Sequence, residues 1–247
     1  MTDINDESLV SSRRGFLAGV AGFATLTLAP GVVLYARAET QSGVAKGTKV
    51  RWGILVDASQ CGPDCNDCVT ACNTEFGLVS HGRPTTDPQW IRKVTVTDPG
   101  SGRSQTFPVM CQHCADPPCV DVCPTTASFR REDGIVLINR HICVGCRYCE
   151  MACPYKARNF VHENVTGQKP YAPRGKGTSE ACTMCVHRVD AGGTPACVEA
   201  CSKGRVAMLF GDLNDPNSEI AKRIAAYNTT QIRSDLRTDP GVRYQGL

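Results

Sequence analysis

Residues 143–154 read CVGCRYCEMACP, which spaces four cysteines as C-x2-C-x2-C-x3-C and ends on proline. Three thiolates from one such tight loop can bind three irons of a single 4Fe-4S cubane. The fourth cysteine begins a short helix and points elsewhere, towards the second cluster of a pair. The stretch therefore predicts a fold organised around paired 4Fe-4S clusters.

All 16 cysteines of the 247-residue chain fall into quartets of this kind, and none is left over. The gaps vary, with three residues after Cys61, four before Cys119 and eleven before Cys197, but the last gap is always three. Since each cluster takes four thiolates, the sequence predicts four 4Fe-4S clusters with sixteen cysteine ligands. The quartets are Cys61, Cys65, Cys68 and Cys72, then Cys111, Cys114, Cys119 and Cys123, then Cys143, Cys146, Cys149 and Cys153, and finally Cys182, Cys185, Cys197 and Cys201.

Disulfides and zinc are the alternative uses of so many cysteines. An exported cysteine-rich chain is ordinarily a disulfide framework. Zinc ribbons also use C-x2-C pairs, but they do not generate the spacing of residues 143–154. Visible absorption distinguishes both alternatives from iron–sulfur clusters.

The N-terminus resembles a twin-arginine export signal. Arg13 and Arg14 precede an uncharged stretch that ends at the small-x-small site Ala36-Arg37-Ala38. We expect residues 1–38 to be this signal, cleaved after Ala38, and the mature protein to be periplasmic. That export route is used by proteins that take up cofactors before crossing the membrane. The alternative is an uncleaved membrane anchor, although Pro30-Gly31 interrupts the uncharged stretch. No second candidate span follows in the sequence, so we expect the mature chain to lack a direct membrane span.

Charge and motif content exclude several classes of function. The 27 Lys and Arg against 24 Asp and Glu give a net charge of +3, too little for a nucleic-acid-binding protein. The chain has no G-x-G-x-x-G loop, no C-x-x-C-H haem site, no H-E-x-x-H pair and no nucleophile elbow. We therefore expect no catalytic site, and single-electron transfer without bond chemistry.

The segments between the quartets predict a small α+β scaffold. Apolar residues alternate over 50–56, as in a half-buried strand, and Ile220 and Ile224 share one face of a helix that begins at Ser218. Turn signals at 98–100 and 133–134 predict hairpins in the segments 94–109 and 127–138. Trp52, Trp90 and Tyr148 are assigned to the core.

Several polar residues near the quartets have two interpretations each. His113 and His187 lie beside ligand cysteines, where each is either a hydrogen-bond donor to cluster sulfur or, as we prefer, an ordinary packed side chain. Lys169, Arg174 and Lys176 form either a docking patch for an acidic partner or a solvated loop.

From about Lys49 to the C-terminus the chain resembles the four-cluster ferredoxin-type subunits of membrane-associated oxidoreductases. The shared stretches include Cys111-Gln112-His113-Cys114, Cys182-Thr183-Met184-Cys185 and Gly211-Asp212-Leu213-Asn214. The resemblance implies two nested bacterial-ferredoxin-like dicluster modules with short strands, hairpin insertions and short helices. Residues 39–110 would form the first half of the outer module with a hairpin insertion, 111–160 the inner module, and 161–247 the second outer half with a C-terminal segment.

The same resemblance implies how the cysteines are shared, whereas spacing alone also allows quartets that neighbour each other in the chain to pair. The first gap of this chain holds three residues, Gly62, Pro63 and Asp64, where the first quartet of the family usually has two. The implied ligand sets are Cys61, Cys65, Cys68 and Cys201; Cys182, Cys185, Cys197 and Cys72; Cys111, Cys114, Cys119 and Cys153; and Cys143, Cys146, Cys149 and Cys123.

The resemblance also implies partners. These are an integral quinone-interacting membrane subunit of the polysulfide reductase membrane-subunit type and a multihaem cytochrome c. The ending over residues 239–247 and the approach 177–182 look most like the periplasmic iron–sulfur subunit of the dissimilatory sulfite reductase-associated transmembrane complex. Tetrathionate, polysulfide and nitrite reductase subunits share most of the motifs, and a free diffusible carrier is the remaining alternative.

Overall fold

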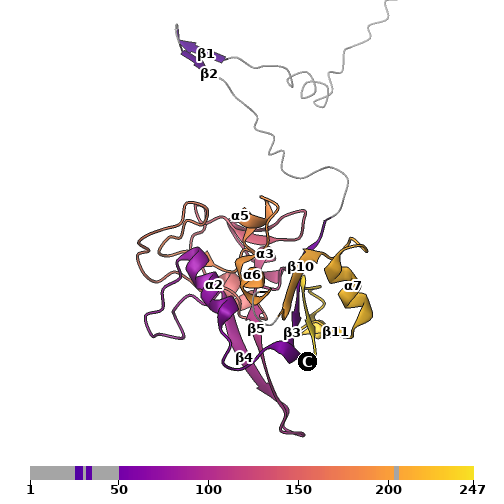
Figure 1. Cartoon of the computed structure of the whole chain (residues 1–247). Helices are drawn as coiled ribbons and strands as arrows, with labels where there is room; N and C mark the ends of the chain where they lie inside the picture. Colours follow the sequence, from indigo (N-terminus) through magenta and orange to yellow (C-terminus); the bar gives the residue numbers. More distant parts are fainter. Residues whose placement is uncertain (1–25, 30–31, 35–49, 203–205) are drawn as a thin grey trace, which may run out of the picture. The chain divides into compact units, whose positions relative to one another are not determined.

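The computed structural model describes residues 26–29, 32–34, 50–202 and 206–247 (Figure 1). The chain divides into two compact units, Met1–Lys46 and Gly47–Leu247. In the first unit, β1 (Leu26–Ala29) pairs antiparallel with β2 (Val32–Leu34). The paired arginines and the expected cleavage site lie outside the described residues. Among the helices that the structure describes, none has the length and apolar character needed to cross a bilayer.

A four-stranded sheet in the order β10-β3-β12-β11 forms one side of the second unit. The strand expected at 50–56 is β3, and it is buried on both faces rather than half-buried. Ile54 and Val56 join the core that contains many of the cysteines, while helix α7 packs on β3 and β10 and covers the sheet. The strands are β3 (Trp52–Asp57), β10 (Met208–Asp212), β11 (Thr229–Thr230) and β12 (Val242–Gln245).

The C-terminal strand β12 was not expected from the sequence. It runs parallel to β3, and its Val242 and Tyr244 are completely buried. The Tyr244 hydroxyl donates to the Pro108 carbonyl at 3.2 Å and accepts from Gln112 Nε2 at 3.2 Å. These bonds fasten the end of the chain to the segment that leads into the second cysteine quartet.

Both expected hairpins are confirmed. β4 (Ile91–Thr97) pairs with β5 (Ser104–Met110), and this hairpin extends away from the rest of the unit (Figure 1). β6 (Ser128–Arg130) pairs with β7 (Val136–Ile138). A third, two-residue pairing joins β8 (Asn159–Phe160) to β9 (Ser179–Glu180) and was not expected.

The helices are short, and most of them carry cysteines. α2 packs against α6, and α3 packs against α4. The helix expected at Ser218 is confirmed as α7, because the Ser218 hydroxyl accepts from the Ala221 N–H at 3.2 Å and caps the first turn. The helices are α2 (Asp67–Phe76), α3 (Pro118–Asp121), α4 (Tyr148–Ala152), α5 (Val186–Val189), α6 (Ala196–Ser202) and α7 (Glu219–Ala226), with 3-10 turns η1 (Ala58–Gln60) and η2 (Ser234–Leu236).

Of the three aromatic residues assigned to the core, one is not there. Trp90 is completely buried, and Trp52 stacks on Phe210 with ring centroids 5.0 Å apart. Tyr148 is 54% exposed. It precedes Cys149 on a helix of five residues, and burying the cysteine turns the tyrosine towards solvent.

Candidate metal centres

Each of two packed helix pairs brings together cysteines from quartets that are separated in the sequence. Cys68 and Cys72 lie four residues apart on α2, and so on one face of that helix. Cys197 and Cys201 have the same relation on α6, which packs against α2. The helices of quartets one and four therefore meet, as do α3 and α4 of quartets two and three.

A first site forms where the loop before α2 meets the end of α6. Cys61, Cys65, Cys68 and Cys201 line a common cavity together with Lys93 and Met208. Burial, followed by repulsion from Cys201, raises the pKa of Cys68 to about 12 and that of Cys61 to about 11. Such thiols become thiolates at neutral pH only when a cation binds them.

A second site lies on the other half of the α2–α6 pair. Burial raises the pKa of Cys72 well above its usual value, and the neighbouring Cys197 and Cys185 raise it further. Burial likewise raises the pKa of Cys182, with Cys72 and Cys197 the next largest causes. These four side chains therefore face one another.

A third site combines quartet two with the last cysteine of quartet three. Burial raises the pKa of Cys111 to about 12 and that of Cys114 to about 11. The charges of Cys119 and Cys153 contribute to both increases. The third site therefore consists of these four cysteines.

A fourth site takes the remaining four, since Cys123, Cys143, Cys146 and Cys149 line one cavity with Arg147. The Ser128 N–H donates to Cys123 Sγ at 3.4 Å, and the Ser179 N–H donates to Cys143 Sγ at 3.5 Å. Sulfur that accepts such bonds is better stabilised as thiolate.

Electrostatic contacts between sites give their order. The charge of Cys68 in the first site contributes to the raised pKa of Cys72 in the second. Cys111 of the third site contributes to the raised pKa of Cys182 in the second. Cys149 of the fourth site contributes to the raised pKa of Cys119 in the third. The four sites follow one another as a line.

Exposure follows the same order. All eight cysteines of the second and third sites are buried. In the first site Cys61, Cys65 and Cys201 are partly exposed, and in the fourth site Cys146 is exposed and Cys123 and Cys143 are partly exposed. Only the two ends of the line reach solvent.

The donor sets fit clusters better than single ions. Four sulfurs bound to one zinc at about 2.3 Å lie only about 3.8 Å apart. In the part of the chain that the structure describes, no three Cys, His, Asp or Glu side chains are close enough to share one metal ion. A cubane binds each thiolate through a different iron and so requires wider spacing. All sixteen cysteines are described, and none is in a disulfide.

Two buried polar atoms beside the cysteines also fit a cluster. His113 is 0% exposed, and its Nδ1 accepts from the Val136 N–H at 3.0 Å. Burial, followed by the charges of Arg158 and Arg51, lowers its pKa to about 3, so the ring is neutral and Nε2 carries the proton. Nε2 has no hydrogen-bond partner, and neither does Thr183 Oγ1 between Cys182 and Cys185. A sulfide-rich cluster supplies acceptors for such donors.

Two basic residues that sequence reasoning missed contact the sites. Lys93 Nζ donates to the Cys65 carbonyl at 2.7 Å, to the Pro63 carbonyl at 2.8 Å and to the Gly62 carbonyl. It thereby holds the loop with the unusual first gap. Arg158, 6% exposed, donates to Cys119 Sγ at 3.0 Å. The only sequence signal for it was one charged residue within the otherwise mostly apolar segment 157–161.

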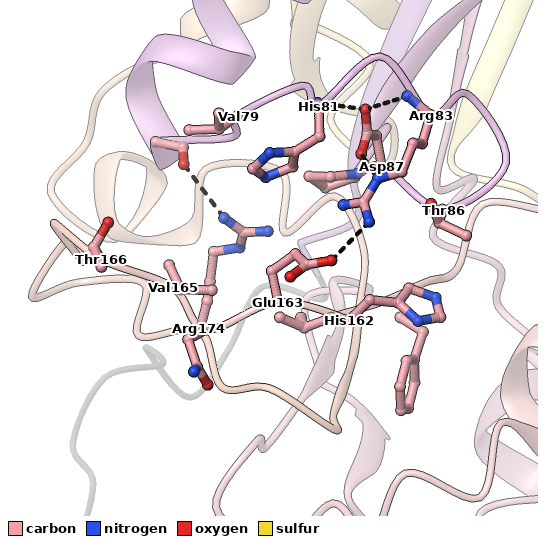
Figure 2. A pocket seen from close by; sticks show the side chains of 15 residues that line it. Val79, His81, Arg83, Thr86, Asp87, His162, Glu163, Val165, Thr166 and Arg174 are labelled. Atoms are coloured by element: carbon pink, nitrogen blue, oxygen red, sulfur yellow. Dashed lines mark hydrogen bonds and ion pairs between the residues drawn. The ribbon is translucent and has the colours of Figure 1, made fainter.

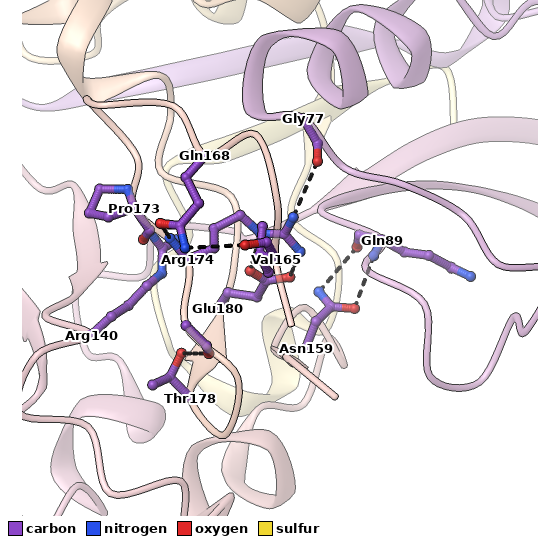
Figure 3. A network of polar contacts seen from close by, with 11 residues as sticks. Gly77, Gln89, Arg140, Asn159, Val165, Gln168, Pro173, Arg174, Thr178 and Glu180 are labelled. Carbon is purple, nitrogen blue, oxygen red and sulfur yellow. Dashed lines mark hydrogen bonds and ion pairs between the residues drawn. The ribbon is translucent and has the colours of Figure 1, made fainter. Parts of the chain in front are cut away.

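Arg174 belongs neither to a docking patch nor to a solvated loop. It is buried, and its guanidinium donates to both carboxylate oxygens of Glu180 at 2.7 and 2.8 Å, and to the Gly77 carbonyl at 3.3 Å (Figure 3). Glu180 is fully buried and demands a paired cation. The pair joins the segment before quartet four to the end of α2.

The cavity in Figure 2, of about 140 Å³, is lined without cysteine. Its charged groups pair with one another, because Arg83 Nη1 contacts Glu163 Oε1 at 2.8 Å. Asp87 Oδ2 accepts from the His81 N–H at 2.6 Å and from the Arg83 N–H at 2.9 Å. These carboxylates organise a loop and do not form an acid–base pair.

The line of cysteine sites defines a 4Fe-4S protein, and comparison with known proteins agrees. A family model described as a 4Fe-4S dicluster domain matches residues 103–213. The chain is 42% identical to the Hdr-like menaquinol oxidoreductase iron-sulfur subunit 1 of Archaeoglobus fulgidus, over 81% of this chain and 84% of that protein. It is 38% identical to one subunit of the tetrathionate reductase of Salmonella typhimurium, over 80% and 73%. It is also 38% identical to Protein NrfC of Escherichia coli, over 93% and 92%.

The chain therefore belongs to the family of iron–sulfur electron-transfer subunits of oxidoreductase complexes.

Proposed function

We propose that this chain carries four 4Fe-4S clusters and relays single electrons along them between two partner subunits. The observation that carries the proposal is the line of four cysteine sites whose middle members are buried and whose ends reach solvent. A linear set of clusters allows electron tunnelling across a distance that one centre could not bridge. The clusters supply the redox chemistry, and the chain spaces them, excludes water from the middle pair and donates hydrogen bonds to their thiolates.

The proposed ligands are the four sites described above. The first and second clusters form an outer module and the third and fourth an inner one, because α2 packs on α6 and α3 packs on α4. α2 and α6 then each supply cysteine to both outer clusters, whereas α3 and α4 carry Cys119 and Cys149 and the chain just beyond them carries Cys123 and Cys153. The chain itself makes and breaks no substrate bond in this proposal.

An apolar surface at the fourth site supports a stable partner there. Six large apolar side chains, each at least 38% exposed, come from segments that surround its cysteines. Exposed apolar patches of this kind mark protein interfaces. The loop of the first site instead exposes Asp64 and Asp67. The six residues are Val122, Phe129, Ile142, Val144, Tyr148 and Met151.

We propose that this apolar surface binds the quinone-interacting membrane subunit and that the polar first site faces a second redox subunit, a multihaem cytochrome c. A relative named as part of a menaquinol oxidoreductase supports a quinol-reactive partner. A periplasmic location, reached by twin-arginine export, belongs to the same proposal and rests on the Arg13-Arg14 motif.

The pathway we propose is the one associated with dissimilatory sulfite reductase. The similarity to the tetrathionate reductase of Salmonella typhimurium favours a second candidate, in which the same relay serves a reductase for an oxidised sulfur compound. In both, the chain has the same role and only the second redox subunit differs.

Iron and sulfide analysis of protein purified without oxygen tests the relay. About sixteen irons and sixteen sulfides per chain are expected, with a reduced-state EPR spectrum of interacting clusters. About eight irons would refute the four-cluster line. Iron-free protein would refute the function itself.

A double variant tests the partner surface. Tyr148→Glu with Met151→Glu is expected to keep the iron content and to abolish reduction of the clusters by menaquinol in the presence of the membrane fraction. The matched control is Val79→Glu with Val96→Glu, which changes two exposed apolar residues away from the fourth site, at 60% and 50% exposure. Equal reduction of both double variants would exclude the surface.

A further inference from the structure

Arg158 lies between the third and fourth sites and is linked to both. Its Nη2 donates to Cys119 Sγ of the third site at 3.0 Å. Its Nη1 donates to Ser128 Oγ at 3.1 Å, and the Ser128 N–H donates to Cys123 Sγ of the fourth site at 3.4 Å. One guanidinium therefore reaches one site directly and the other through a single residue.

In the described part of the chain, the charge of Arg158 is not balanced by an ion pair with a carboxylate. No Asp or Glu lies within ion-pair distance of it among the described residues, although its side chain is only 6% exposed. Burial is the largest single effect and lowers the pKa of Arg158, but the charges of Cys119 and Cys111 in the third site and of Cys149 in the fourth, and the hydrogen bond to Cys119, together raise it overall. A buried cation is tolerated only when it is paired, so Cys119 is its direct counter-charge, while Cys149 and the Glu150 carboxylate act on it beyond ion-pair distance.

The other buried arginines are compensated differently. Arg174 has the Glu180 carboxylate. Arg51 donates to the carbonyls of His113 and Asp239, each at 3.0 Å, and to no sulfur. The placement of Arg158 against sulfur is therefore a specific feature of the junction between the third and fourth sites.

We propose that Arg158 raises the reduction potentials of the third and fourth clusters together and so makes these two clusters stronger electron acceptors. The inference rests on the proposed four-cluster relay and assigns to one residue the tuning of two of its clusters. Reduction adds one electron to a cluster that already carries the negative charge of four thiolates. A fixed cation nearby, in a site of low dielectric constant, stabilises the reduced form more than the oxidised form.

The effect of charge is separated from that of hydrogen bonding by substitution. Arg158→Gln removes the charge and keeps N–H donors, whereas Arg158→Lys keeps the charge and loses the planar fork. The matched control is Arg103→Gln, the same change at an exposed position of the β4–β5 hairpin. The readout is an EPR-monitored redox titration with dithionite of the intact, anaerobically purified chain.

In Arg158→Gln the reduction equilibria of two clusters are expected to shift at least tenfold towards the oxidised form, which corresponds to about 59 mV for one electron. The other two clusters keep their potentials, Arg158→Lys recovers most of the shift, and Arg103→Gln is unchanged. Unaltered potentials in Arg158→Gln would overturn the proposal. So would an equal shift in Arg158→Lys, because a role through shape alone predicts it.

The outcomes stay separate from those of the proposed function. Wild-type protein with sixteen irons and four reducible clusters supports the relay whatever the variants do. If Arg158→Gln lacks iron at two sites only, Arg158 is needed for cluster assembly rather than for potential, and the proposal is overturned while the relay stands.

Discussion

Gly145 lies in the loop between Cys143 and Cys146, where a single methyl group should dislodge the fourth cluster. Its φ is +70°, a conformation that costs an L-residue about 1–2 kcal/mol. A Cβ added there would lie 2.1 Å from the Gly177 carbonyl oxygen. Because real Cβ contacts stay above 3.0 Å, one backbone must move by about 0.9 Å. Gly177 is two residues before Ser179, whose N–H donates to Cys143 Sγ, so the movement also removes this bond.

Gly102 provides the matched control for the backbone term. Its φ is also +70°, but an added Cβ meets nothing within 4 Å. Gly102→Ala should therefore show the conformational cost alone, whereas Gly145→Ala adds overpacking of about 1–3 kcal/mol. The difference between the two variants isolates the contact with Gly177.

The assay is iron content together with denaturant unfolding of both anaerobically purified variants. We expect Gly145→Ala to fall from about sixteen to about twelve irons and to be less stable than Gly102→Ala, which keeps all its iron. A Gly145→Ala protein with full iron and the same stability as Gly102→Ala would refute the assignment of this loop to a cluster.

Three further predictions concern other parts of the fold. Lys93→Met, which removes the cation that holds three carbonyls of the first loop, should lose about four irons on exposure to air while the wild type keeps them, as followed by iron release. The cluster-free chain should be most stable below pH 9, the usual thiol pKa, because folding disfavours the thiolates of Cys61 and Cys68. It should lose stability as the pH rises through their raised pKa values of about 11 and about 12. Circular dichroism should show this loss in the cluster-free chain and not in the iron-loaded protein. Tyr244→Phe should cost about 1–3 kcal/mol in urea unfolding, since the Pro108 carbonyl loses a buried donor, and an unchanged midpoint would mean that β12 is not held there.

The cysteine pattern made the chemistry predictable, and local signals made several elements predictable. The β4–β5 and β6–β7 hairpins follow from turn residues between apolar runs, and α7 follows from a serine cap and an apolar face. These features depend on neighbours in the sequence. The hairpins and α7 can therefore be predicted without knowing where they lie in the folded protein.

The features that sequence reasoning missed depend on distant contacts. The residues of β12 look like a polar ending in the sequence, but Val242 and Tyr244 are buried once they lie beside β3. Arg158 gains meaning only when Cys119, 39 residues earlier, lies against it. Arg174 was assigned to a docking patch or a solvated loop because it is charged. It is buried instead, because its guanidinium pairs with the opposite charge of Glu180.

The final gap of three residues, common to all four quartets, explains why the sites form a line. Residues four apart on a helix share a face and are separated by about 6 Å along its axis. Cys68 and Cys72 lie one turn apart on α2, and each contributes to a different site. When α6 packs on α2 with the same internal spacing, its cysteines fall opposite them, and two adjacent sites result. The α3–α4 pair repeats the packing, with Cys119 and Cys149 on the helices and Cys123 and Cys153 just beyond their ends. Cys111 beside Cys182 joins the two pairs end to end. The common gap thus keeps the two sites of each packed pair close, the contact of Cys111 with Cys182 keeps the second and third sites close, and this closeness is the requirement for electron transfer along the line.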